Sequence, residues 1–521
     1  MSIKNFARAG GTYVTAPIFY ANAEPHIGHA YTAIICDAAH RWNKMKDKHG
    51  PSFFSIGTDE HGSKIFRAAV NAGKTPKLFC DEVSTKFSTI FEKLNVEPSH
   101  FVRTTDYKHA RAVQQFWKTF QKNGHIYKSS YSGYYSIVDE CFLPEADITT
   151  KNIDGKEVKV VKSTQTAVEW IEEENYMFKL SNFRDEIRKW IEKSNVIRPE
   201  KYVPMALSSL DMDEDLSISR SSERLSWGIP VPEDSSQTIY VWLDALVNYL
   251  TVTGYPEMKV NWPPTCQVIG KDIIKFHLFY WPAFLLAAGL PLPEKFLVHG
   301  HWLVDNVKMS KSLGNVINPN EAIEKYTSEG LRYFLLKHGN PNDDSSFSHS
   351  SCIEAINSDI VNNIGNLLNR STVQKMNTAV RYPEFPIEEM DENVKNEAKT
   401  LISMVSTLKR DCEGLYEEMM YYKVIELLMA TMKEANRVFQ ATQPWKEKDR
   451  HKLDSIFLIT YESLRIVSIL MKPITPIFAE FCLSRLSIPK NQRNLEFAEI
   501  GRYSGGVLGA DKGIFMERLQ K

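Results

Sequence analysis

Apolar and polar residues follow two alternating patterns along the first third of the chain. Short runs rich in β-branched and aromatic residues, at Thr12–Thr15, Phe53–Ile56 and Phe101–Thr104, each precede a longer amphipathic segment. The same pattern returns at Gln267–Gly270 and Lys295–His299. Strands that alternate with helical segments are typical of βαβ units, so the pattern predicts a parallel sheet of the α/β class.

A long insertion, from about Gln115 to Ile229, separates the early strands of this sheet from the late ones. Within it, the segment Asn152-Ile153-Asp154-Gly155 is flanked by lysines and valines. Asp-Gly between such segments is typical of a tight hairpin turn, because both residues tolerate positive φ. The insertion is therefore expected to contain a β-hairpin, followed by amphipathic helices.

Helical periodicity replaces strand-like runs after about Ser350. Apolar residues recur at spacings of three and four, as one buried helical face requires, at Val394, Ala398, Leu401, Ile402, Val405 and Leu408. A further helix is expected over Leu453–Met471, because Pro473 lacks the backbone donor that would extend it. The last third of the chain is predicted to be a helical bundle.

The 521 residues exceed what one hydrophobic core usually supports, so two or three domains are expected. We predict the boundaries 1–114 and 230–350 for the two parts of the sheet domain, 115–229 for the insertion and 351–521 for the helical domain.

Composition is typical of a soluble globular protein, with 43% hydrophobic and 24% charged residues. The formal net charge is −1, so no strong overall field attracts a polyanion, and nucleic-acid binding would need local basic or stacking surfaces. The longest apolar run, around Trp281–Pro291, is too short to span a bilayer. No membrane association is therefore expected.

The seven cysteines are scattered and form no C-x-x-C pair, which is typical of reduced thiols. The insertion holds Cys141 alone, whereas a structural zinc site needs four closely placed ligands, so no bound zinc is expected. Lys4 and Arg8 precede the first acidic residue, Glu24, which is the bias of a mitochondrial transit peptide.

One candidate phosphate site is Pro25-His26-Ile27-Gly28-His29, which follows the first predicted strand and opens a helical run over Ala30–Trp42. A helix N-terminus offers backbone N–H groups and a positive dipole end to a phosphate. Gly28 allows a base or ribose to approach closely, and His26 and His29 can donate hydrogen bonds to phosphate oxygens. Alone, the motif also fits a capped helix start with two incidental histidines.

A second candidate, Lys308-Met309-Ser310-Lys311-Ser312-Leu313-Gly314-Asn315, follows the late strand. Two lysines on a loop of small residues can close over a triphosphate and stabilise the charge on a departing pyrophosphate. A solvated basic loop is the alternative interpretation. Together, the two motifs resemble the paired signatures of class I aminoacyl-tRNA synthetases.

Further segments narrow this resemblance to the methionyl-tRNA synthetase family, over about Thr12 to Leu519. They are Ala16-Pro17-Ile18-Phe19-Tyr20-Ala21-Asn22, Gly57-Thr58-Asp59-Glu60-His61-Gly62, Trp227-Gly228-Ile229-Pro230-Val231-Pro232, Tyr240-Val241-Trp242-Leu243-Asp244-Ala245 and Ile269-Gly270-Lys271-Asp272-Ile273-Ile274-Lys275-Phe276-His277. The resemblance implies a Rossmann-like catalytic domain with a connective insertion and a helical anticodon-binding domain. It also implies activation of L-methionine with ATP and Mg²⁺, followed by transfer to the 3′ end of tRNA(Met).

The resemblance assigns the methionine pocket to Ile18, Tyr20, Trp242, Ile273 and His277, and the substrate ammonium to Asp59. Aromatic and aliphatic walls suit a flexible thioether. Core packing is the alternative for each wall residue.

For ATP, the resemblance assigns binding to Gly28, Asp272, Ser310 and Lys311, with Asp272 on the ribose hydroxyls. The catalytic residues would be His26, His29, Lys308 and Lys311.

In the helical region, Asn366-Leu367-Leu368-Asn369-Arg370 and Gln443-Pro444-Trp445 resemble the family's anticodon-reading positions. Asn366 and Arg370 are four residues apart, so they share a helix face from which they could reach unstacked bases. Trp445 would stack on a splayed-out base. A helix surface and a capped loop are the alternative interpretation.

Lack of zinc ligands, a compact C-terminal region and the basic N-terminus together resemble the mitochondrial and related bacterial branch of the family. We expect the mitochondrial matrix, with the bacterial cytoplasm as the alternative. The chain stops soon after the bundle, without the appended tRNA-binding module that often dimerises, so we expect a monomer.

Three other functions fit the same residues less well. A simple nucleotidylyltransferase would not need the long helical third. A synthetase for valine, leucine or isoleucine would need an editing domain larger than this insertion. A binding protein derived from a synthetase would be expected to lose His26, His29 or Lys311, and all three are present.

Overall fold

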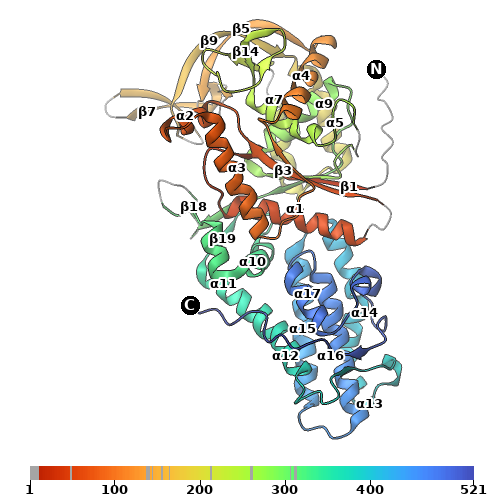
Figure 1. The fold of residues 1–521 in the computed structure, drawn as a ribbon. Coiled ribbons are helices and arrows are strands. Elements are labelled where there is room, and N and C mark those ends of the chain that lie inside the picture. Colours follow the sequence, from red (N-terminus) through yellow and green to blue (C-terminus); the bar gives the residue numbers. More distant parts are fainter. Residues whose placement is uncertain are drawn as a thin grey trace. The chain divides into compact units, whose positions relative to one another are not determined.

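The computed structural model describes residues 11–46, 50–136, 141–143, 145–153, 156–162, 165–211, 214–258, 262–304, 307–309 and 314–520 (Figure 1). The chain forms two compact units. The first comprises Met1–Pro25, Phe53–Phe91 and Glu97–Val298, and the second comprises His26–Ser52, Glu92–Val96 and His299–Lys521. Early and late parts of the sequence therefore fold together in each unit.

The first unit is built on a sheet with the strand order β10-β16-β15-β1-β3-β2, to which β4 adds beside β3. Its strands are β1 (Thr12–Thr15), β2 (Phe19–Tyr20), β3 (Ser52–Asp59), β4 (His100–Arg103), β10 (Ile197–Arg198), β15 (Cys266–Gly270) and β16 (Phe296–His299). Val14 lies opposite Cys266, and Ile56 lies opposite Phe101, both in parallel registers. The expected parallel sheet, interrupted in sequence by the insertion, is confirmed.

Burial on both faces explains the apolar composition of these strands. Every residue of β15 and β16 is buried, as is every residue of β3 after Phe53. Strands covered on both sides are expected to form continuous apolar runs. The helices α4 (Tyr107–Lys122) and α9 (Trp281–Ala287) contribute Phe116 and Trp281 to this core, with ring centres 6.2 Å apart.

The insertion adds antiparallel strands to the first unit. The strand β5 (Ile126–Ser136) pairs along its whole length with β9 (Val168–Phe178). The predicted hairpin is confirmed, because β7 (Ile148–Ile153) pairs with β8 (Lys156–Val161) in antiparallel register. Its turn residues, Asp154 and Gly155, lie outside the described residues.

The second unit is mainly helical, as expected for the last third of the chain. Its helices are α1 (Ile27–Lys46), α10 (Pro319–His338), α11 (His349–Ala355), η8 (Ile356–Gly365), α12 (Asn366–Thr372), α13 (Glu392–Glu397), α14 (Lys399–Glu417), α15 (Tyr421–Thr442), α16 (Arg450–Met471) and α17 (Pro476–Arg485). Figure 1 shows α14 to α17 gathered into a bundle. Among the described helices, none combines the length and the apolar content that crossing a membrane requires.

Two helix predictions differ from the structure in detail. The apolar face from Val394 to Leu408 was expected on one helix, yet it is divided at Ala398, which ends α13 and begins α14. The apolar residues keep their spacing of three and four across the break because Ala398 is itself buried. The helix expected over Leu453–Met471 ends where predicted but begins at Arg450, because the Asp449 side chain accepts a hydrogen bond from the backbone of Lys452.

Candidate functional site

In the first unit, the carboxyl ends of β2 and β3 place two of the expected pocket residues side by side. Tyr20 lies opposite Asp59 in the parallel register, and the backbone N–H of Ala21 donates to the Asp59 carbonyl at 2.8 Å. Asp59 is the last residue of β3, with 7% of its surface exposed. Ile18 lies half-buried just before β2. A nearly buried carboxylate at this sheet edge suits a cationic group.

A stacked aromatic pair forms a second part of the same unit. Trp242, near the start of α7 (Val241–Leu246), stacks on Phe276 with ring centres 3.6 Å apart and planes inclined by 7°. The Trp242 and His277 rings are nearly perpendicular, with planes inclined by 88° and ring centres 6.5 Å apart. Trp242, Phe276, Tyr20 and the half-buried Ile273 all pack against one hydrophobic core. These aromatic and aliphatic side chains are therefore all held by packing against the same core.

His277 is held neutral and in one tautomer. Its Nδ1 lies 3.1 Å from the carbonyl oxygen of Ile273, which can only accept, so this nitrogen carries the proton. Its Nε2 lies 2.8 Å from the Tyr249 hydroxyl and accepts from it. Burial lowers the pKa of His277 to about 4, although the Ile273 carbonyl partly opposes this shift. The ring therefore presents no charge to this region near neutral pH.

The loop after β3 is fixed by an ion pair between the buried Glu60 and the partly exposed Arg103, which no sequence motif indicated. Glu60 is fully buried and accepts two hydrogen bonds from Arg103, at 2.6 and 2.9 Å. Thr58 and Thr105 each donate a further hydroxyl to its carboxylate. A bidentate pair completed in this way holds the backbone next to Asp59 in one conformation.

Asp272 lies in the short turn η5 (Lys271–Ile273), directly after the sheet strand β15. Its side chain is exposed. In α/β sheets, ligands bind outside the carboxyl ends of the strands, so this position suits contact with a substrate.

In the second unit, the expected phosphate motif forms the start of α1. The rings of His26 and His29 stack with centres 3.8 Å apart. Backbone N–H groups donate to both Nδ1 atoms, from Gly28 to His26 at 3.0 Å and from His26 to His29 at 3.2 Å. In the neutral rings the remaining proton is therefore on Nε2, the atom suited to donate to a phosphate.

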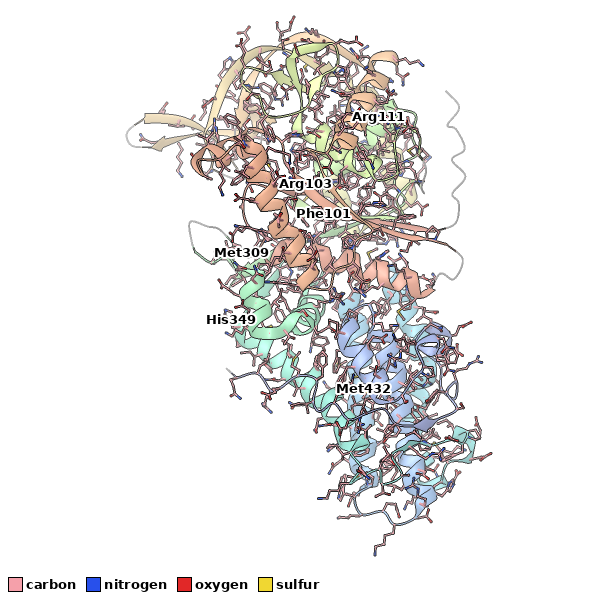
Figure 2. All side chains as sticks on the ribbon, in the orientation of Figure 1. Phe101, Arg103, Arg111, Met309, His349 and Met432 are labelled. Carbon is pink, nitrogen blue, oxygen red and sulfur yellow. The ribbon has the colours of Figure 1, made fainter. Side chains whose placement is uncertain are left out.

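A Cβ at position 28 would lie 2.8 Å from Cε1 of His26, so a larger residue there would displace the His26 ring. The same position is 4.0 Å from the methyl carbon of Met309, so the end of β18 (Val307–Lys308) lies near the helix start. Figure 2 labels Met309 beside this helix. Met309 of the second signature thus lies near the first signature within the second unit.

Part of the second signature is not described. Ser310 and Lys311 lie outside the described residues, and of Lys308 only the backbone is described, paired with Leu303 in β17 (Trp302–Val304). Their expected roles remain predictions.

The helical part of the second unit brings Arg370 and Trp445 around one aromatic ring. The guanidinium of Arg370 lies 5.1 Å from the ring centre of Phe439, and the Trp445 ring lies 6.5 Å from it. Trp445 is 43% exposed, which leaves a face for stacking. Burial lowers the pKa of Arg370, and its Nε has no hydrogen-bond partner among the described residues.

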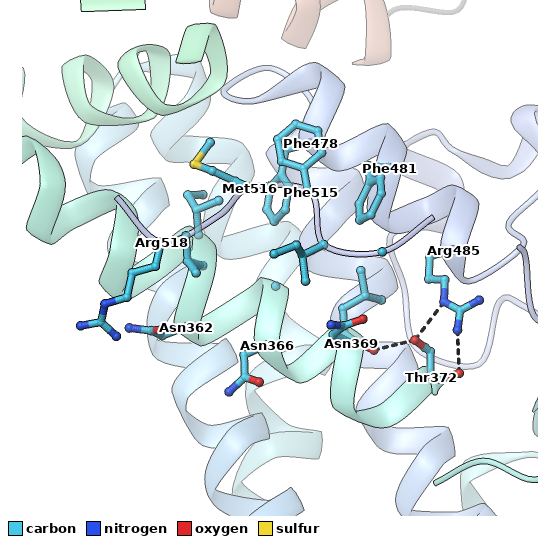
Figure 3. A pocket seen from close by; sticks show the side chains of 16 residues that line it. Asn362, Asn366, Asn369, Thr372, Phe478, Phe481, Arg485, Phe515, Met516 and Arg518 are labelled. Atoms are coloured by element: carbon cyan, nitrogen blue, oxygen red, sulfur yellow. Dashed lines mark hydrogen bonds between the residues drawn. The ribbon is translucent and has the colours of Figure 1, made fainter. Parts of the chain in front are cut away.

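Asn366 begins α12, where its side chain is exposed at the edge of a cavity of about 360 Å³ (Figure 3). Phe478, Phe481 and Phe515 line the other side of this cavity. Asn366 and Arg370 thus lie on one helix, but Phe439 adjoins only Arg370 and Trp445 in the contacts above. No sequence motif indicated Phe439, because its partner Arg370 is far away in the sequence.

Comparison with known proteins gives a consistent assignment. Residues 12–372 match the family described as tRNA synthetases class I (M), and residues 398–502 match the anticodon-binding domain of tRNA ligase. The mitochondrial methionine–tRNA ligase of Homo sapiens is 42% identical, over 98% of this chain and 91% of that protein, and that of Xenopus laevis is 40% identical, over 97% and 92%.

Among solved structures, the methionyl-tRNA synthetase of Mycobacterium tuberculosis bound by methionyl-adenylate superposes with a TM-score of 0.91. It is 34% identical, over 97% of this chain and 100% of that one. The chain therefore belongs to the class I (M) tRNA synthetases, the family of the methionine–tRNA ligases.

Proposed function

We propose that this protein joins L-methionine to tRNA(Met) in two steps. In the first, the methionine carboxylate attacks the α-phosphorus of ATP, which forms methionyl-adenylate and releases pyrophosphate. In the second, a ribose hydroxyl at the 3′ end of the tRNA attacks the acyl carbon and releases AMP. The Mycobacterium relative was solved with methionyl-adenylate, the intermediate that links the two steps.

The observation that carries the proposal is the neutral, aromatic environment around Trp242, Phe276 and His277. A thioether gains from contact with aromatic rings, by up to about 1.5 kcal/mol for each sulfur–aromatic contact. Asp59 binds the substrate ammonium, while Ile18, Tyr20 and Ile273 complete the walls. A charged side chain on the substrate would find no counter-ion in the neutral His277, so acidic and basic amino acids are disfavoured.

For the adenylation step, His26 and His29 donate from Nε2 to phosphate oxygens, and Gly28 admits the nucleotide. Preorganised donors of this kind act where negative charge develops, so they favour the transition state over the bound substrate. Lys308 and Lys311, with Ser310, hold the departing pyrophosphate. Asp272 accepts hydrogen bonds from the ribose hydroxyls.

We propose that Mg²⁺ enters with ATP. Among the described residues, no group of three or more histidine, cysteine or acidic side chains could hold a metal ion. The steps above use no metal held by the protein. The expected lack of bound zinc stays a prediction, which elemental analysis tests.

The helical region selects the tRNA. Arg370 and Trp445 present a cation and an exposed indole around Phe439, and Asn366 adds amide groups that can pair with base edges. The unsatisfied Nε of Arg370 supports a role in donating to a base.

We propose that the enzyme works in the mitochondrial matrix, because the curated relatives above are named as mitochondrial enzymes. We also propose that it is a monomer. The alternative location is the bacterial cytoplasm. Expressing the chain with a fluorescent tag and observing whether it enters mitochondria distinguishes the two locations. Light scattering of the purified protein measures the oligomeric state.

Formation of methionyl-tRNA tests the proposal. Purified enzyme should attach radioactive methionine to tRNA(Met) when ATP and Mg²⁺ are supplied. After ribonuclease digestion of the product, the radioactivity should remain on an aminoacyl-adenosine fragment. The proposal would be contradicted if no methionine became acid-precipitable when tRNA(Met) from mitochondria or from bacteria was supplied. Tyrosine or isoleucine in place of methionine is the negative control.

A further inference from the structure

Asp244 is a fully buried acid that none of the roles above uses. It lies on α7, two residues after Trp242, with no part of its side chain exposed. Its Oδ2 lies 2.7 Å from Nδ1 of His61, and its Oδ1 lies 2.7 Å from Nε2 of His109. His109 continues the chain of contacts through its Nδ1, 2.9 Å from the Thr251 hydroxyl.

These contacts fix both the charge and the tautomers. Burial alone would raise the pKa of Asp244, but His61 and His109 outweigh it and hold the pKa below its usual value. An ionised carboxylate only accepts hydrogen bonds, so each histidine directs an N–H toward it. One buried carboxylate therefore binds two imidazoles from separate segments of the chain.

Asp244 thus connects three segments of the chain, and the first is the loop that carries Asp59. His61 follows Asp59 by two residues, and its ring packs edge-on against Trp227, 5.5 Å away. Trp227 in turn donates its indole N–H to the Glu60 carbonyl at 2.6 Å and accepts from the Gly62 backbone at 3.1 Å. The position of this loop therefore depends on the partner that holds His61.

The second segment is α7 itself, whose Trp242 stacks on Phe276. Asp244 lies two residues after Trp242 on the same helix, so a shift of the backbone at Asp244 also moves the Trp242 indole. The third is α4, through His109, which Thr251 on α8 (Asn248–Thr251) holds from its other side.

We propose that Asp244 is a positioning residue that sets the distance between the ammonium-binding Asp59 and the side-chain wall formed by Trp242. The proposal rests on the methionine pocket described under the proposed function. Asp244 contacts no substrate in it. Its carboxylate fastens the Asp59 loop and the Trp242 helix to each other through His61, and braces both on α4 through His109.

The consequence is a specific kinetic signature. A pocket that binds the ammonium at one end and the thioether at the other loses affinity when the spacing changes, because both ends can then no longer be bound without strain. The nucleotide is proposed to bind through other residues, so it should not sense the change directly. Loss of Asp244 should therefore weaken methionine binding far more than ATP binding.

The test is Asp244→Asn in the full-length enzyme, an exchange of similar shape that removes the charge. We expect the KM for methionine in ATP–pyrophosphate exchange to rise about tenfold or more, with the KM for ATP changed less than about twofold. The dissociation constant of methionine, measured by calorimetry without ATP, should rise by the same factor as the KM. A rise in both KM values together, or in neither, would overturn the proposal.

A matched control is Asp359→Asn, the same exchange at another buried acid. Asp359 is 2% exposed and bonded to Tyr333 at 2.6 Å in the second unit. It should lower the melting temperature without changing the KM for methionine. If it also raised that KM, general destabilisation would explain the effect and the positioning role would be wrong.

Two further measurements keep the test decisive. If Asp244→Asn does not fold, His109→Gln leaves the Asp244–His61 contact in place and should raise the KM for methionine in the same direction by a smaller factor. An unchanged KM in folded His109→Gln would contradict the bracing role. Failure of the proposed function itself would be distinguishable, because the unmodified enzyme would then show no methionine-dependent exchange.

Discussion

The Tyr249 hydroxyl donates to Nε2 of His277 at 2.8 Å, which leaves the imidazole bonded on both sides while uncharged. Protonating Nε2 would require the Tyr249 hydroxyl to accept instead of donate, and it would place a charge in a site with 2% exposure. The pair therefore acts as a neutral boundary in the region assigned to the methionine side chain. This arrangement has a measurable effect on stability as well as on binding.

Stability should fall at acidic pH because of His277. Its pKa is lowered from 6.5 to about 4, so the unfolded chain binds the proton more readily than the folded one. The stabilisation is complete above pH 6.5 and is lost as the pH falls toward 4, by about 3 kcal/mol in all. In urea unfolding at pH 7 and pH 5, His277→Gln should lose less stability than the unmodified protein. Equal losses in both would show that His277 is not responsible.

Lys311→Ala should slow adenylate formation by on the order of a hundredfold or more, because the Lys311 charge matters mainly as pyrophosphate leaves. The dissociation constant of methionine should stay nearly unchanged. Rapid-quench measurement of adenylate in a single turnover separates the two quantities. Lys118→Ala, at an exposed position on α4, is the control and should react at the normal rate. Near-normal adenylation in Lys311→Ala would refute the assigned role.

The purified protein should contain no stoichiometric zinc and should keep its activity after chelation and return of Mg²⁺. The physical reason is the ligand count, since four close ligands are needed and Cys141 is the single cysteine of the insertion. Elemental analysis gives the answer directly. One zinc per chain would mean that ligands other than cysteine hold it.

Trp445→Ala should impair charging of tRNA while leaving ATP–pyrophosphate exchange nearly intact. Stacking of a base on an aromatic side chain contributes about 1–3 kcal/mol, so kcat/KM for tRNA should fall roughly ten- to a hundredfold. Ile477→Ala, which shortens another exposed apolar side chain of the second unit, should change neither reaction. If Trp445→Ala lowered both reactions in a protein with a normal melting curve, Trp445 would be a packing residue.

Local pattern was sufficient for much of the fold. The first strand, the Asn152–Gly155 hairpin and the end of α16 at Met471 follow from signals within a few residues of each position. The break at Ala398 does not, because a buried alanine keeps the spacing of a continuous helix on both sides.

The candidate site divides in the same way. Residues such as His26 and Trp242 stand in motifs that can be read from the sequence, whereas Tyr249, Phe439 and Arg103 act through partners that only folding brings near. Asp244 lies within a recognisable motif, but its role depends on His109, which lies far away in the sequence. Tertiary pairing of this kind leaves no local periodicity to detect.

The most direct test of the central claim is ATP–pyrophosphate exchange with each of the twenty amino acids in turn. The account predicts exchange with L-methionine, weak exchange at most with isosteric apolar amino acids, and none with charged ones, because Trp242, Phe276 and the neutral His277 favour an uncharged flexible side chain. Strong exchange with another amino acid, or equal exchange with leucine and methionine, would contradict the assignment of the pocket and of the function.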